Sequence, residues 1–207
     1  MPNAFTFPMT PPDLSAFLEP NWNAPLDVDA HIAKIPADAS IKGMFFQDAI
    51  ETAKRLSGTS PAARNYISFK SYPMREFVRV LADSARAAYP ALSTRQGIRR
   101  LGSTVYPTLV DSMVGKVLFS IAEKSIRRAL ELTPRAYEIT VSPGNAKLTW
   151  VEEGRAVLHL EHLWNFPGTY HVGIFEGAIS AFEATGSVKV KQHSEHEAEL
   201  LVTWTRW

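Results

Sequence analysis

The sequence predicts an α+β protein in which an N-terminal helical bundle precedes an antiparallel sheet of about five strands with one inserted helix, in the order β-β-β-α-β-β. Between residues 44 and 132, apolar residues recur every three to four positions, which is the period of an amphipathic helix. After Pro134 they alternate with polar residues, as in a strand with one buried face. A run of helices followed by a run of strands is typical of the α+β class with an antiparallel sheet.

The chain has 207 residues, enough for one domain with a sizeable core. We expect an arm at residues 1–40 and a single α+β domain at residues 41–207. The arm combines prolines such as Pro11 and Pro12 with large apolar side chains such as Phe5 and Trp22. A free tail rarely keeps so many aromatic residues, so we expect the arm to pack on the domain or on a partner subunit.

Composition excludes several classes of partner and chemistry. Lysine and arginine number 22 against 21 acidic residues, a net charge of +1 with both signs interspersed, so we expect no nucleic-acid partner. Cysteine is absent, which excludes disulfides, thiolate nucleophiles and cysteine-ligated metals. No apolar run approaches the length of a membrane span and no basic leader opens the chain, so we expect a cytoplasmic protein.

The helical part of the chain is bounded by prolines, glycines and capping residues. Asp13 is suited to capping a short helix that ends before Pro20. The stretch 106–132 predicts either two helices or one bent helix, because it has Pro107 near its start and Gly115 inside it. The other predicted helices are 44–56, stopped by Gly58; 72–89, with Pro73 in its first turn; and 93–101, capped by Ser93.

The strands follow in order. Alternation at Tyr137, Ile139 and Val141, a turn at 143–145 and a second alternating run at 148–150 predict a hairpin. The remaining predicted strands are 155–162, 187–193 and 198–204. A helix from Val172 to Phe182 is inserted after the first of these strands. Its Gly173 and Gly177 allow a neighbouring backbone to approach closely.

Polar and aromatic residues near this inserted helix form the candidate ligand site. We expect His162 to share a strand face with Leu158 and Leu160, and His171 to begin the helix. If the sheet covers a cavity, polar tips would meet an aromatic wall there, as a small-molecule site requires; ordinary core packing is the alternative. The candidate residues are His162, Trp164, Tyr170, His171 and Phe175.

The sequence contains no motif that identifies a catalytic or metal-binding site. The segment GIRRLGS at 97–103 lacks the lysine of a phosphate-binding loop, and no nucleophile elbow or zinc-protease motif occurs, so we expect no enzyme. The run QHSEHE at 192–197 offers His193, His196 and Glu197 to a divalent metal, but a solvated turn between two strands is the preferred interpretation, and we assign no metal.

Four motifs in order carry a resemblance to a known family: GMFF at 43–46, FKSYPMREFVRVL at 69–81, RLGSTVYPTLVDSMVGK at 100–116 and GTYHVGIFEGAISAF at 168–182. From about Ile41 to its end, the chain resembles a paralogous domain of unknown function found mainly in myxobacteria. It is more distantly similar to the superfamily of haem–nitric-oxide domains, vinyl-reductase-type ligand-binding domains and vesicle-tethering subunits. That resemblance implies a cavity between helices and sheet, and often a dimer.

The resemblance also indicates which cofactors and functions to expect. The chain lacks the tyrosine–serine–arginine signature and the proximal-helix histidine of the haem-binding members, so haem is a disfavoured alternative. It also lacks the cysteines of metal-bearing sensors. We expect a non-enzymatic sensory domain that takes an apolar small molecule between helices and sheet and forms a homodimer. A ligand-free interaction or scaffold module and a haem-type gas sensor are the alternatives.

Overall fold

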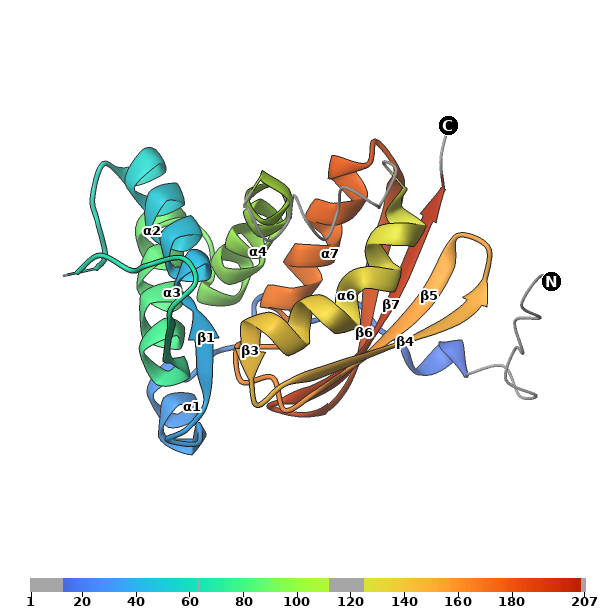
Figure 1. The fold of residues 1–207 in the computed structure, drawn as a ribbon, viewed down its shortest axis with the longest axis horizontal. Helices are drawn as coiled ribbons and strands as arrows, with labels where there is room; N and C mark the ends of the chain where they lie inside the picture. The colour runs from blue at the N-terminus through green and yellow to red at the C-terminus, as the bar shows by residue number, and fades with distance from the viewer. Residues whose placement is uncertain (1–12, 63, 112–124, 206–207) are drawn as a thin grey trace.

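The computed structural model describes residues 13–62, 64–111 and 125–205. Figure 1 shows a helical half, built around α2 and α3, beside a half in which α6 and α7 lie against a twisted sheet. The helix α4 lies between α3 and α7 and contacts both. The core is continuous between the two halves: Phe46 and Phe77 of the helical half belong to the same buried cluster as Leu158 and Leu200 of the sheet.

The helical half contains α1 (Val28–Lys34), α2 (Gly43–Ser57), α3 (Met74–Ala88) and α4 (Thr94–Asp111). Helix α2 ends as predicted at Gly58, whose φ of 75° is favourable for glycine. Asp13 accepts a hydrogen bond from the Ser15 amide at 3.0 Å and caps a single 3-10 turn, η1 (Leu14–Ala16). The predicted helices at 44–56 and 72–89 are thus confirmed within a few residues.

The main sheet has four antiparallel strands in the order β4-β5-β7-β6. The strands are β4 (Asn145–Glu152), β5 (Arg155–Glu161), β6 (Thr185–Ser194) and β7 (Glu197–Thr205). The helix α7 (Tyr170–Ala181) is inserted between β5 and β6, as predicted. Alternate side chains on β5 and β7 point into the core, because successive residues of a strand face opposite sides.

A second, three-stranded sheet joins the two halves. Its strands are β2 (Ser71–Pro73), β1 (Ser40–Lys42) and β3 (Val141–Ser142), in the order β2-β1-β3. Ile41 at the centre pairs with Tyr72 on one side and with Val141 on the other. This pairing brings the end of α6 (Ile126–Thr140) close to the start of α2, although nearly one hundred residues separate them in the chain.

Helices α4 and α7 pack backbone to backbone through glycines. A Cβ atom on Gly102 would lie 2.2 Å from the Tyr170 carbonyl oxygen, and one on Gly173 would lie 2.0 Å from that of Arg99. A Cβ atom on Gly177 would likewise lie 2.4 Å from the Ser103 carbonyl oxygen. Only glycine fits at these positions, which confirms the expectation that Gly173 and Gly177 bring a neighbouring backbone close.

The α+β class is confirmed, but two details of the prediction are wrong. The sheet has four strands rather than five, and Tyr137 to Thr140 are the last turn of α6 rather than a strand. The helix continues past Pro134 because Leu130, Thr133 and Tyr137 keep a helical period on its buried side. The expected hairpin is therefore absent: β3 pairs with β1, and β4 pairs with β5 around the turn at Gly154.

The helix predicted at 93–101 does not stop there. Helix α4 runs to Asp111 through Gly102 and Pro107, since close packing against α7 stabilises a stretch whose own helix propensity is low. The predicted stretch 106–132 is thus shared between the end of α4 and the start of α6. Residues 112–124, which would distinguish two helices from one bent helix, lie outside the described residues.

The segment before α1 lies on the outer face and edge of the main sheet. Phe17 is buried against Val157 and Leu201, on the side facing away from α7. Leu18 pairs with Val190 of the edge strand β6 through two backbone hydrogen bonds of 2.9 Å. The segment therefore covers part of an otherwise open sheet edge.

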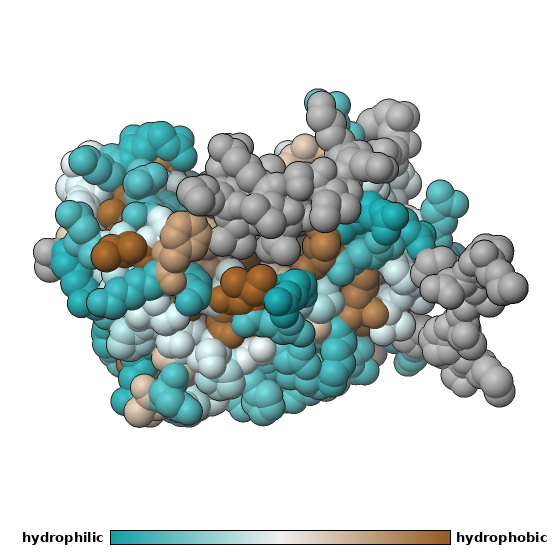
Figure 2. Space-filling view, viewed as in Figure 1, coloured by the Kyte–Doolittle hydropathy of each residue, from teal (hydrophilic) through white to brown (hydrophobic). Residues whose placement is uncertain are grey.

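The surface is mainly hydrophilic on the face that Figure 2 shows, and apolar colour is confined to separate areas. Among the described residues, the exposed large apolar side chains are Leu18, Leu56, Ile67, Phe69 and Leu92. None of the described helices is both long enough and apolar enough to cross a membrane.

Candidate ligand-binding site

A buried polar network lies where α6, α7 and the loop after β5 meet. The His171 Nε2 atom lies 2.9 Å from Asn165 Oδ1, and its Nδ1 atom lies 2.5 Å from the Tyr137 hydroxyl oxygen. Since the amide oxygen only accepts, Nε2 carries the proton and donates it to Asn165, and the Tyr137 hydroxyl donates to Nδ1. Each polar atom of the imidazole therefore has a partner.

Burial keeps this network uncharged. It lowers the pKa of His171 to about 3, because the imidazolium form would have to exist away from water. Burial also raises the pKa of Tyr137, so its hydroxyl keeps the proton that it shares with His171. At neutral pH the two groups form a neutral hydrogen-bonded pair in the middle of the molecule.

Tyr170, the residue next to His171, has a buried hydroxyl with no hydrogen-bond partner among the described residues. Its ring packs against Phe77 of α3, with ring centroids 5.8 Å apart. Burial raises the pKa of this hydroxyl well above its usual value, and the charge of Asp48 adds to the effect. Buried polar groups normally have a partner, so a free hydroxyl here indicates a place for water or a ligand.

Asp48 supplies a second buried polar group from the helical half. Its carboxylate accepts hydrogen bonds from Thr104 Oγ1 at 2.8 Å and from Thr108 Oγ1 at 2.5 Å. Burial raises the pKa of Asp48, although both threonine hydrogen bonds act in the opposite direction. The interior between α2, α4 and α7 thus contains polar groups and is not a purely apolar core.

The five residues predicted from the sequence do not all meet. Tyr170, His171 and Phe175 are buried together on α7. His162 is exposed and has a φ of 57° just after the end of β5, so the expectation that it shares the inner face with Leu158 and Leu160 is wrong. Trp164 is half-buried, with its ring 4.4 Å from that of His196.

Three residues of the site were missed by the sequence analysis. Tyr137 was placed in a strand, although its seven-residue spacing from Leu130 would have indicated the buried side of a helix. Neither Asn165 nor Asp48 belongs to a sequence motif. Asp48 could have been recognised as a polar residue inside an apolar helical stripe, but Asn165 has no such signal. Their roles depend on contacts between distant parts of the chain.

A surface groove of about 370 Å³ lies near this interior, between α1, the start of α4 and the loop before α7. His31 lines it, with Nε2 2.6 Å from the Trp164 carbonyl oxygen and its ring stacked on Phe166. Arg95 and Glu195 add charges to its wall. This groove suits a polar molecule better than the apolar ligand expected from the sequence.

The network around His171 and Tyr170 does not fit haem. Haem needs an axial ligand with a free donor atom, but both nitrogens of the buried His171 are already bonded. Helix α6 contains no histidine, and the close approach of α4 to α7 at Gly102 and Gly173 leaves no room for a porphyrin between these two helices. The Tyr170 hydroxyl has no hydrogen-bond partner within the described part of the chain, but its raised pKa opposes the phenolate that iron would need.

Solved structures with a similar fold include H-NOX proteins. The S. oneidensis H-NOX protein in its Fe(II)NO state has a TM-score of 0.60 and 13% identity, covering 80% of this chain and 100% of that one. The unliganded Fe(II) H-NOX protein from K. algicida has a TM-score of 0.57 and 12% identity, covering 81% and 98%. An oxygen-binding H-NOX domain related to soluble guanylate cyclases has a TM-score of 0.59 and 14% identity, covering 80% and 96%.

At these identities the likeness establishes the fold and nothing about the ligand. No curated protein matches the sequence. One family model does match, over residues 34–205, which include every described helix and strand except η1 and α1, of which only the last residue, Lys34, is matched. The chain therefore belongs to the family described as protein of unknown function DUF2378.

Proposed function

We propose that this chain is a non-enzymatic sensory domain that uses an H-NOX-like fold to bind a small, mostly apolar molecule without haem. The observation that supports this most is the Tyr170 hydroxyl, which is buried between the helical half and the sheet and has no hydrogen-bond partner among the described residues. A ligand with one hydrogen-bonding group would supply the missing partner.

The surroundings of Tyr170 support an apolar ligand. Phe77 packs against the Tyr170 ring, and Phe175 is buried in the same core cluster. Aromatic walls with one or two polar groups are typical of small-molecule sites. We propose no chemical step at this site. His171 could act as a base only through Nδ1, and it would first have to give up the hydrogen bond that Nδ1 accepts from Tyr137.

The proposal is tested by extracting purified protein with organic solvent and identifying bound molecules by mass spectrometry. Wild-type protein is expected to carry one compound in near-stoichiometric amount, and the Tyr170→Phe variant to lose most of it while remaining folded. The matched control is Tyr66→Phe, since the Tyr66 hydroxyl already bonds Glu76 at 2.7 Å and lies apart from the network.

Two outcomes would contradict the proposal. One is the absence of any compound from wild-type protein together with a Tyr170→Phe variant that is more stable than wild type, because a hydroxyl that serves no ligand only costs desolvation energy. The other is a Soret band after reconstitution with haemin, which would establish the gas-sensor alternative instead.

We also propose that the domain is a homodimer that transmits ligand occupancy to a partner. The fold of the chain is compatible with this proposal, and light scattering tests it directly. A monomer at all concentrations would remove the dimer from the proposal and leave ligand binding to be judged by the extraction experiment.

A further inference from the structure

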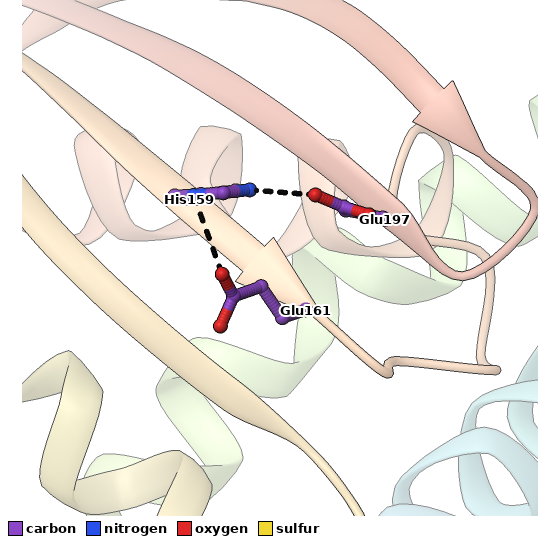
Figure 3. Close-up of side chains that lie close together, drawn as sticks. All are labelled: His159, Glu161 and Glu197. Carbon is purple, nitrogen blue, oxygen red and sulfur yellow. Dashed lines mark hydrogen bonds and ion pairs between the residues drawn. The ribbon is translucent and has the colours of Figure 1, made fainter.

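A group of histidine and glutamate side chains lies on the outer face of the main sheet, away from α7 and from the network around His171. Figure 3 shows its three members: His159 and Glu161 come from β5, and Glu197 comes from the start of β7. His159 and Glu161 are two residues apart on one strand, so their side chains leave the same face.

The register of the sheet brings Glu197 to the same place. Leu160 pairs with Ala198, so Glu161 and Glu197 face each other at the next position of the antiparallel pair. His159 Nε2 lies 3.0 Å from Glu197 Oε1, and its Nδ1 lies 3.6 Å from Glu161 Oε1. One ligand atom from each of the three residues lies within 4.8 Å of the others.

The charges of this group favour a cation. Two carboxylates directly opposite on neighbouring strands repel each other unless a positive charge lies between or beside them. Lys147 of β4 provides one such charge, with Nζ 3.0 Å from both Glu161 oxygens. The Asn145 side-chain amide also donates a hydrogen bond to Glu161 Oε2, at 3.2 Å. Glu197 has the imidazole of His159 as its neighbour.

We propose that His159, Glu161 and Glu197 bind a divalent transition-metal ion of the zinc class. One imidazole and two carboxylates are a donor set that zinc accepts, with water in the open position. Imidazole favours zinc, nickel or copper over magnesium and calcium, which prefer an all-oxygen shell. The side chains are partly exposed, which gives an ion access from solvent. Binding requires Lys147 to leave Glu161.

A neighbouring pair provides an internal comparison. His193 and Glu199 also lie on the outer face, with His193 Nε2 2.6 Å from Glu199 Oε1 and its ring 6.0 Å from that of His159. This pair contributes one imidazole and one carboxylate, and Lys191 also contacts Glu199, at 3.2 Å. It is therefore expected to bind an ion less tightly than the three-residue group.

The experiment is titration of untagged, metal-free protein with zinc chloride by isothermal calorimetry, with circular dichroism to verify that each variant is folded. Wild-type protein is expected to bind one zinc ion per chain. His159→Ala and Glu197→Gln are each expected to weaken binding at least tenfold. His162→Ala is the matched control, because His162 is an exposed histidine of the same region that lies outside the group, and it should bind like wild type.

Cobalt substitution gives a second readout, since the visible absorption of bound Co²⁺ reports nitrogen and oxygen ligands and should disappear in His159→Ala. The proposal is overturned if wild-type protein binds no zinc at micromolar concentrations, which would leave the group as a network of ion pairs. It is also overturned if His193→Ala abolishes binding while His159→Ala does not. Neither result bears on the ligand proposed for the interior, because the two sites lie on opposite faces of the sheet.

Discussion

At the scale of single residues, burial and two hydrogen bonds keep the His171 imidazole neutral. The imidazole is held by Tyr137 on one nitrogen and by Asn165 on the other, and its pKa falls to about 3 because the charged form would be desolvated. In the unfolded chain the same imidazole has a pKa near 6.5. Folding therefore requires the proton to be absent.

This difference predicts a loss of stability in mild acid. Above pH 6.5 the histidine is neutral in both states, so its contribution is fully present. Below that pH the unfolded chain takes up a proton that the folded protein does not, and stability falls by up to about 1.4 kcal/mol per pH unit until pH approaches 3. Urea denaturation at pH 7, 6 and 5 measures the slope. The His171→Gln variant should show a shallower slope; equal slopes for both proteins would contradict this assignment.

At the scale of elements, the contact between α4 and α7 depends on the absence of side chains. Gly173→Ala would place a Cβ 2.0 Å from the Arg99 carbonyl oxygen, so the helices would have to separate. We expect the free energy of unfolding to fall by about 1–3 kcal/mol, although alanine favours the helix itself by about 0.5–1 kcal/mol. Thermal denaturation measures the change. Ser180→Ala, on the exposed side of α7, is the control and should change stability by about 0.5 kcal/mol or less.

The ion pair between Arg99 and Glu176 belongs to the same contact. Arg99 Nε lies 2.7 Å from Glu176 Oε2, and the Trp22 ring covers the guanidinium at 4.3 Å. Arg99 therefore joins α4 to α7 and to the segment before α1. The four-residue spacing of Arg95 and Arg99 puts them on one face of a helix, but a spacing carries no information about what that face contacts.

At the scale of the whole molecule, the segment before α1 covers the outer face and one edge of the main sheet. Phe17 is buried against Val157 and Leu201, so Phe17→Ala is expected to lower the free energy of unfolding by about 3–5 kcal/mol. Leu18→Ala is the control, because the Leu18 side chain is 66% exposed and only its backbone pairs with β6. Chemical denaturation compares the two variants.

Light scattering on the same variants addresses the dimer. If the segment packs only on its own domain, Phe17→Ala should alter stability without altering the mass in solution. A change of mass at unchanged stability would instead place this segment on a partner subunit. Equal stability of wild type and Phe17→Ala would contradict the packing observed here.

Local signals predicted much of the fold. Gly58 ended a helix, Asp13 capped a turn, and alternation placed three of the four strands of the main sheet within a few residues. The predictions were wrong where tertiary contacts outweighed the local preference of the sequence. Pro134 and the alternation that follows it suggested a strand, but Tyr137 is held in α6 by its hydrogen bond to His171 and by burial.

The sequence by itself determined the α+β class, the inserted helix with its glycines, and a candidate region around Tyr170, His171 and Phe175, because helix and strand periods and glycine positions are properties of neighbouring residues. The tertiary structure decided that Tyr137 and Asn165 complete the network around His171, that His162 turns away from it, and that Glu197 joins His159 and Glu161. These arrangements depend on helix packing and strand register, which bring together residues from 6 to 38 positions apart and have no signature in a local pattern.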